Sequence, residues 1–267
     1  LNSDNATASL TNYYSIIFIK DNDYVAPTPS NELNLQLLSS FSNGAAGTNS
    51  AEIVAFDPST DRLYIANSIG QKMDVVNFSN PAAPALITSI SMVPYGGINS
   101  IVSKNGIVAV AVENANPQLN GSVVFFDQNG LFLNQVTVGA MPDMITFNQD
   151  YTKVLTANEG EPNATYSVDP EGSVSIINIA GGIAALTQAN VTNISLSQYN
   201  GQEVALRAQG IRIFTSSASV AQDLEPEYIA VSTDNTKAYV TLQENNALLT
   251  IDLLTNSIVS LTPFGYS

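Results

Sequence analysis

The chain of 267 residues contains no cysteine, no histidine and no tryptophan. The absence of cysteine excludes disulfide bonds and thiolate nucleophiles, and the absence of histidine excludes a Ser-His-Asp triad and every histidine-ligated metal site. Cationic side chains are also scarce, because 8 Lys and Arg face 23 Asp and Glu and leave a formal net charge of −15. Since nucleic acids and anionic lipids are bound by clustered Lys and Arg, neither is expected as a partner.

Long hydrophobic runs are absent as well. The longest, such as Ile107–Val112, are far shorter than the roughly 20 residues of a membrane-spanning helix, so no transmembrane segment is predicted. No signal peptide precedes Leu1, which indicates a mature chain or a fragment. With 45% hydrophobic and 12% charged residues the chain is expected to fold, and its many asparagines are typical of extracellular proteins, secreted or anchored at the cell surface.

One motif recurs along the chain. It consists of a β-rich run, a turn with Asp or Asn and a basic residue, and a second run that ends in small polar residues. Copies begin at Glu52, Asn99, Asp143 and Glu227, and the second contains the hairpin signal Asn105-Gly106. The first three starts are 47 and 44 residues apart, which is the period of a four-stranded propeller blade.

The sequence therefore predicts an all-β fold, a β-propeller of four-stranded antiparallel blades. About four blades are visible, and they are interpreted as an incomplete part of a longer propeller or one that another chain completes. The fourth strand of the third blade is expected at Leu186–Val191, and a closing outer strand at Leu33–Ser42. The predicted segments are an N-terminal strand and Pro-containing linker (1–32), a propeller segment (33–267), blades at about 51–92, 98–139, 142–192 and 226–263, and an insertion at 192–224.

Several longer segments carry a family resemblance. Examples are Gly121-Ser-Val-Val-Phe-Phe-Asp127, Val154-Leu-Thr-Ala-Asn-Glu-Gly-Glu-Pro-Asn163 and Asp223-Leu-Glu-Pro-Glu-Tyr-Ile-Ala-Val231. From about residue 33 to the end the chain resembles the bacterial choice-of-anchor I proteins, which are similar to mesenchyme-specific cell-surface glycoproteins. The resemblance implies a secreted, surface-anchored β-propeller longer than this chain, and some members carry phosphatase-like labels. Residues 1–32 depart from the family.

In a propeller blade the start of the first strand and the end of the second lie at the same rim. The repeats place nearly half of the acidic residues at this rim, whereas Arg62, Lys104, Lys153 and Lys237 fall in turns at the opposite face. Oxygen ligands without nearby cations suit Ca²⁺, although the spacing is not that of an EF-hand. The candidate metal ligands are Glu52, Glu113, Asp143, Asn158, Glu159, Glu161, Asp169, Glu171, Glu227 and Glu244. The alternative is that acidic loops only keep the protein soluble and that Asn and Asp form ordinary turns.

These features predict a structural or binding module for adhesion or matrix assembly, with calcium as ligand. Cell-surface or matrix components are the expected partners, or further copies of the chain through strand addition. One alternative is a calcium-dependent phosphoesterase of phosphatase or phytase type, for which Arg207 and Arg212 of the insertion would have to fold over the rim. Another is a subunit of an extracellular filament or layer. No catalytic residue is assigned, and candidate N-glycan acceptors are Asn120, Asn163, Asn190 and Asn193.

Overall fold

The computed structural model describes residues 36–42, 51, 53–214 and 217–265. The chain divides into two compact units, residues 1–37 and 38–267, and the described residues belong almost wholly to the second. The strand and linker predicted within residues 1–32 therefore lie outside the described residues, as does Glu52. Residues 36–42, the described part of the expected closing strand, form no strand.

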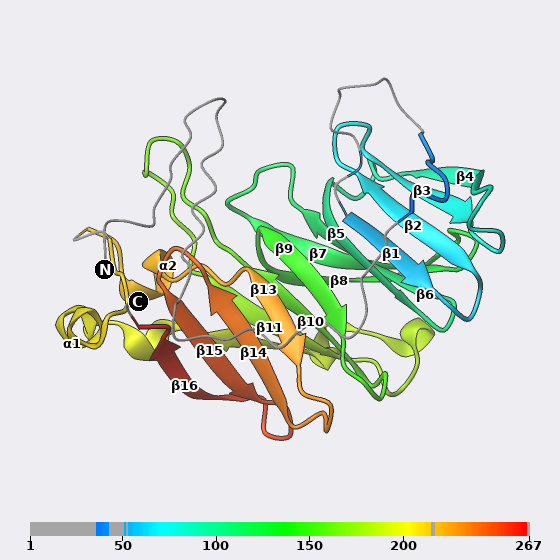
Figure 1. The fold of residues 1–267 in the computed structure, drawn as a ribbon. Helices are drawn as coiled ribbons and strands as arrows, with labels where there is room; N and C mark the ends of the chain where they lie inside the picture. Colours follow the sequence, from blue (N-terminus) through cyan, green and yellow to red (C-terminus); the bar gives the residue numbers. More distant parts are fainter. Residues whose placement is uncertain (1–35, 43–50, 52, 215–216, 266–267) are drawn as a thin grey trace, which may run out of the picture. The chain divides into compact units, whose positions relative to one another are not determined.

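The described residues fold into four sheets of four antiparallel strands, which confirms the predicted all-β fold (Figure 1). In each sheet the strands follow one another in chain order. The first two sheets comprise β1 (Ile53–Asp57), β2 (Arg62–Asn67), β3 (Lys72–Asn77), β4 (Ala85–Ser91), β5 (Gly97–Lys104), β6 (Ile107–Glu113), β7 (Asn120–Asp127) and β8 (Phe132–Ala140). The last two comprise β9 (Pro142–Phe147), β10 (Lys153–Asn158), β11 (Ser173–Asn178), β12 (Val191–Ser195), β13 (Tyr228–Val231), β14 (Lys237–Leu242), β15 (Ala247–Asp252) and β16 (Ser257–Pro263).

Three apolar cores hold the successive sheets together. Tyr64 and Met73 of the first sheet are buried against Val110 of the second. Side chains of β6 and β7 pack on β9 to β11 in the same way, and those of β10 and β11 pack on β13 to β15. Since strand residues alternate between faces, the inner strands are apolar on both sides, as the run Ile107–Val112 illustrates. The innermost strands also contact one another in series, β1 with β5, β5 with β9 and β9 with β13, which is a propeller-like arrangement.

The outermost strand of the third sheet lies later than expected. It is β12 at Val191–Ser195, whereas the prediction was Leu186–Val191. Leu186 is buried, but it follows a 3-10 helix at Ile183–Ala185 and lies in the core shared with the second sheet. The buried hydrophobic residue within the paired part of β12 is Ile194, which lies opposite Val174 of β11. A hydrophobic residue therefore indicated burial here without indicating strand pairing.

The insertion after β12 carries two short helices, α1 (Glu203–Gln209) and α2 (Val220–Asp223). Leu206, Val220 and Leu224 are buried in the core between the third and fourth sheets. This packing fixes the insertion against the end of β14 and the start of β15, which is where the acidic residues gather.

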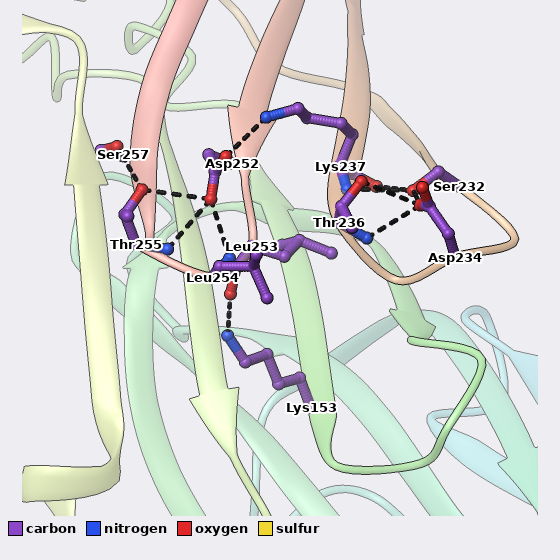
Figure 2. Close-up of polar contacts among 10 residues, drawn as sticks. All are labelled: Lys153, Ser232, Asp234, Thr236, Lys237, Asp252, Leu253, Leu254, Thr255 and Ser257. Atoms are coloured by element: carbon purple, nitrogen blue, oxygen red, sulfur yellow. Dashed lines mark hydrogen bonds and ion pairs between the residues drawn. The ribbon is translucent and has the colours of Figure 1, made fainter.

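Basic residues at the other end of the sheets connect neighbouring sheets. Arg62, at the start of β2, donates from Nη1 to the carbonyl of Gln128 and at 3.0 Å to Asn129 Oδ1 in the β7–β8 turn. Lys153, at the start of β10, donates to the carbonyl of Leu253 and at 2.8 Å to Asn256 Oδ1 in the β15–β16 turn. Figure 2 shows Lys153 reaching Leu253. These cations therefore bind carbonyls of a neighbouring sheet and are turned away from the acidic residues.

Candidate functional site

Carboxylates from three chain segments gather where the third and fourth sheets meet the insertion. The segments are β9 with the β10–β11 loop, the stretch from α2 to β13, and the β14–β15 turn. The acidic face is defined by Asp143, Glu159, Glu161, Asp169, Asp223, Glu225, Glu227 and Glu244, whose charges act on one another. Six of these eight residues belong to the predicted metal ligands, and the other two are Asp223 and Glu225.

The β10–β11 loop is held close to the protein by two glycines. Gly160 has φ +74°, and a Cβ there would lie 2.8 Å from the backbone of Glu171. A Cβ on Gly172 would lie 2.0 Å from the carbonyl oxygen of Leu224, so only glycine lets the loop touch the insertion. The loop is closed by Asn163, whose Oδ1 accepts a hydrogen bond from the Ser167 amide at 2.9 Å.

A buried amide joins the insertion to the fourth sheet. Asn245 is fully buried, and its Nδ2 donates to the carbonyl of Asp223 at 2.7 Å and to that of Arg212 at 3.0 Å. Its Oδ1 accepts from the amide of Glu225 at 3.1 Å. In addition, Gln222 Nε2 donates to the carbonyl of Asp169 at 2.6 Å. Asn245 thereby fixes the backbone on both sides of the acidic residues of the insertion.

The crowding of like charges raises carboxyl pKa values. Burial raises the pKa of Glu159 to about 8, and the charges of Glu161, Asp143, Glu225 and Glu244 contribute. Burial and then the charge of Glu244 raise the pKa of Glu225 to about 7. Both groups are therefore partly protonated near neutral pH, which is unusual for glutamate.

Glu227 and Glu244 form a hydrogen-bonded carboxyl pair. Burial raises the pKa of Glu227, and the hydrogen bond and charge of Glu244 raise it further. The same hydrogen bond lowers the pKa of Glu244, and the charge of Arg212 also lowers it. Because two adjacent carboxylates repel each other, a proton is held more readily on Glu227 than on Glu244.

A cavity of about 370 Å³ opens beside this pair. Carboxylates form part of its wall, and Tyr166 and Phe214 are exposed at its border. The lining residues are Glu161, Pro162, Asn163, Ala164, Tyr166, Asp169, Phe214, Gln222, Asp223, Glu225 and Glu244. No sequence signal pointed to Phe214 or Gln222, because only the folding of the insertion brings them here.

The remaining predicted ligands lie apart from the acidic face. Asn158 is fully buried, accepts from Thr156 Oγ1 at 2.9 Å, and donates to Ser173 Oγ at 3.1 Å and Ser175 Oγ at 2.9 Å, so its amide holds the third sheet together. Glu113 ends β6 in the second sheet, where burial raises its pKa. Glu171 lines a separate polar groove with residues of β8 and β12. Among the described residues no group of three or more carboxylates is arranged to hold a metal ion.

The two arginines of the insertion have different positions. Arg207 Nε donates to the carbonyl of Ile213 at 2.9 Å within the insertion. Arg212 is at the acidic face, where its amide donates to the carbonyl of Asn245 at 2.8 Å and its Nη1 lies 3.4 Å from the carbonyl of Glu244. One cation thus lies beside the Glu227–Glu244 pair.

The predicted glycan acceptors also differ in their surroundings. Asn120 and Asn193 are exposed, and Asn190 Oδ1 accepts hydrogen bonds from Thr187. The amide of Asn163 closes the β10–β11 loop through bonds to Ser167 and Thr165. A glycan on Asn163 would have to replace those bonds, whereas one on Asn120 would not.

Comparison with known sequences identifies the family. Residues 52–267 match the Choice-of-anchor I domain. The chain belongs to the choice-of-anchor I family. Membership indicates an extracellular, surface-associated protein with a β fold. None of the curated protein sequences matches this chain, so the similarity to mesenchyme-specific glycoproteins stays a prediction.

Solved structures that resemble the choice-of-anchor I chain share its fold at low identity. Hydrazine synthase of Kuenenia stuttgartiensis has 14% identity and a TM-score of 0.53, over 82% of this chain and 52% of that chain. A functionally unknown protein of Desulfotomaculum acetoxidans has 13% identity and a TM-score of 0.54, over 80% of this chain and 58% of that chain. A Lactobacillus plantarum protein has 13% identity and a TM-score of 0.53, over 80% of this chain and 57% of that chain. The choice-of-anchor I chain therefore spans little more than half of each of these chains.

No helix in the described part of the chain is long and apolar enough to cross a lipid bilayer.

Proposed function

We propose that this choice-of-anchor I domain is a structural or binding module of an extracellular surface, acting in adhesion or matrix assembly, and that its acidic face binds calcium. The observation that supports the proposal is that Glu161, Asp169, Asp223, Glu225 and Glu244 line one cavity. Burial and the crowding of like charges there raise carboxyl pKa values, to about 8 for Glu159 and about 7 for Glu225. A raised pKa means that the surroundings of Glu159 and Glu225 destabilise their ionised carboxylates. A divalent cation among these oxygens would relieve the repulsion and displace the protons.

The scaffold around the acidic face favours this function. Asn245, Gly172 and Gln222 fix the backbones that carry the acids, while Glu161 and Tyr166 are exposed and free to adjust on the solvent side. Calcium accepts six to eight oxygen ligands in variable geometry, including backbone carbonyls and water. Binding would therefore require movement of side chains and not of strands.

Calorimetric titration with CaCl₂ at pH 7.5, together with the melting temperature, tests the calcium proposal. We expect heat of binding, release of protons and a raised melting temperature, with a weaker response to MgCl₂. The double variant Glu159→Gln and Glu225→Gln should lose the response, whereas Asp61→Asn, an exposed turn residue of the first sheet, should keep it. No heat and no rise in melting temperature would remove calcium from the proposal.

A calcium-dependent phosphoesterase is the second candidate, and one observation favours it. Arg212 lies at the acidic face, where a cation would be needed to neutralise a bound phosphate group. Calcium-dependent turnover of p-nitrophenyl phosphate, lost in Glu159→Gln and reduced in Arg212→Ala, would support an enzyme. Calcium binding without turnover would exclude the phosphoesterase and support the structural or binding module.

Assembly into an extracellular filament or layer is the third candidate. The outer strands β4, β8, β12 and β16 end their sheets, and an unpaired strand edge can accept a strand from another molecule. Light scattering against protein concentration tests this candidate. Particles that stay at constant mass up to millimolar concentration would argue against it.

A further inference from the structure

A polar groove lies between the second and third sheets, apart from the cavity at the acidic face. Its volume is about 330 Å³. The end of β8 forms one wall, and β11, β12 and the residues directly before β11 form the rest. Among the described residues that line the groove, Glu171 alone is charged, and most of the others carry neutral hydroxyl or amide groups or expose backbone.

The groove opens where the packing between the second and third sheets changes from apolar to polar. On the face of the third sheet that meets the second, Val154 of β10 pairs with Ile177 of β11, and both belong to the core shared with the second sheet. The next two pairs on this face consist of hydroxyl and amide side chains, namely Thr156–Ser175 and Asn158–Ser173. All four of these side chains are buried, and Ser173 is 4% exposed.

The corresponding pairs of the neighbouring sheets are almost wholly apolar. On the face of the fourth sheet that packs on the third, they are Val240–Leu249 and Leu242–Ala247. On the face of the second sheet that packs on the first, they are Val110–Val124 and Val112–Ser122. Burial of a polar group costs free energy unless the group is hydrogen-bonded. The four buried polar side chains of the third sheet are therefore not a requirement of sheet packing.

The buried polar side chains form a hydrogen-bond network that ends at the groove. Asn158 Nδ2 donates to Ser173 Oγ at 3.1 Å and to Ser175 Oγ at 2.9 Å. Ser175 Oγ in turn donates to Asn193 Oδ1 at 3.3 Å. The hydroxyl proton of Ser173 and the amide protons of Asn193 have no acceptor among the described residues, and both side chains line the groove. They are therefore available as donors to a bound molecule.

The backbone of β8 fixes the opposite wall of the groove. Gln188 Oε1 accepts from the amide of Thr137 at 2.9 Å, and its Nε2 donates to the carbonyl of Thr137 at 2.9 Å. Gly139 lets β8 approach the buried hydroxyl, since a Cβ there would lie 2.5 Å from Ser173 Oγ. Because Gln188 already binds both backbone groups of Thr137, β8 cannot pair with an added strand at this residue. The groove therefore suits a ligand that is bound by side chains and not an extended peptide.

We infer that the polar groove binds a short neutral saccharide. Sugar hydroxyls both donate and accept hydrogen bonds, which matches the donors of Ser173 and Asn193 and the acceptor oxygens of Glu171. Val138 and Val191 also line the groove and supply apolar surface for the C–H face of a sugar ring. An anionic sugar would meet no cationic lining residue and would be repelled by the net charge of −15.

This inference deepens the proposed function by naming a partner, a neutral saccharide of the cell surface or matrix. It rests on the proposed role as a binding module, but it does not rest on calcium at the acidic face, because the groove is a different cavity.

Heteronuclear NMR titration of the 267-residue chain in EDTA tests the inference. The probes are cellobiose, maltose and N,N′-diacetylchitobiose, and digalacturonate is the anionic control. We expect at least one neutral disaccharide to shift the side-chain amide signal of Asn193 and the backbone amide signals of Gly139 and Ser173, and digalacturonate to shift none of them. No shift with any neutral probe, or larger shifts with digalacturonate, would overturn the inference. Because EDTA removes divalent cations, this result is separate from the calorimetric test of calcium binding.

A matched pair of variants on β12 locates the bound saccharide. Asn193→Ala removes a donor at the groove and should raise the Kd of the disaccharide roughly tenfold. Thr192→Ala is the control and should leave the Kd unchanged, because Thr192 pairs with Ile176 and its side chain lies on the other face of β12. Both side chains are exposed, so neither change should prevent folding. An unchanged Kd in Asn193→Ala, or equal losses in the two variants, would overturn the inference.

Discussion

Glu227, directly before β13, and Glu244, in the β14–β15 turn, lie close enough that each shifts the pKa of the other. Their hydrogen bond joins two carboxyl groups that would repel each other if both were ionised. Arg212 is the cation whose charge acts on Glu244, and it lies on the insertion that Asn245 fixes to the fourth sheet. One buried amide therefore holds the segment that brings a cation to the pair.

Stability should fall as the pH rises from about 5 to 8 in the absence of divalent cations. The folded-state pKa values of Glu159 and Glu225, about 8 and about 7, lie above the usual 4.5. The folded protein thus binds more protons than the unfolded chain between pH 4.5 and 8, and it loses stability through that window. After allowance for solvent screening we expect a decrease in melting temperature on the order of 3 °C by calorimetry.

The control for this pH dependence is the double variant Glu159→Gln and Glu225→Gln, in which the slope should flatten. Below about pH 4 the opposite trend takes over, because hydrogen bonds lower the pKa of Asp150 and Asp234 from 3.8 and their stabilisation disappears on protonation. A melting temperature that rises steadily from pH 5 to 8 would contradict the prediction.

Replacing Asn245 by alanine should destabilise the protein by ~2–4 kcal/mol. The change leaves the carbonyls of Asp223 and Arg212 and the amide of Glu225 without their partner in a buried place. Urea denaturation measures the loss, and Asn80→Ala is the matched control, since Asn80 is exposed and its amide oxygen only caps a local turn. Equal losses of unfolding free energy in the two variants would show that the hydrogen bonds of Asn245 do not hold the insertion on the fourth sheet.

The sheets could be predicted from the sequence because they depend on local signals. Alternation, turn residues such as Asn105-Gly106 and the period of the motif indicated the first two strands of every sheet. The position predicted for the outer strand β12 was wrong because Leu186 is buried by contacts with the second sheet and not by strand pairing. A hydrophobic residue in the sequence does not show which of these two causes buries it. Which residues pair in the outer strand depends on their contacts with β11, and these contacts cannot be read from the local sequence of β12.

The acidic face was predictable to the extent that strand ends define it. Glu159, Glu161, Glu227 and Glu244 gather because second-strand ends and first-strand starts lie at one edge of the sheets. Asn158 departs from the expectation because the side chain next to Glu159 points into the sheet and bonds to Ser173 and Ser175. The closeness of Arg212 could not be predicted, since it depends on how the insertion docks through Asn245.

Replacing Gly172 by alanine should displace the insertion from the β10–β11 loop. A Cβ would lie 2.0 Å from the Leu224 carbonyl and 2.7 Å from Pro226 Cδ, so the backbone must move. We expect a loss of ~1–3 kcal/mol in urea denaturation and weaker coupling among the acidic residues, seen as a lower pKa of Glu225 by NMR. Gly181→Ala is the control because nothing lies within 4 Å of its Cβ position, and equal stability of both variants would contradict the prediction.

The cations at the opposite end of the sheets should differ in their effect on stability. Lys153→Met removes donors from the carbonyl of Leu253 and from Asn256 Oδ1 on the next sheet, which should cost ~1–2 kcal/mol. Lys237→Met breaks a partly exposed ion pair with Asp252 inside one sheet, which should cost ~0–1 kcal/mol in the isolated chain. Denaturant titration of both variants distinguishes a contact between sheets from a contact within one. A larger loss for Lys237→Met than for Lys153→Met would mean that the turns, and not the neighbouring sheets, depend on these cations.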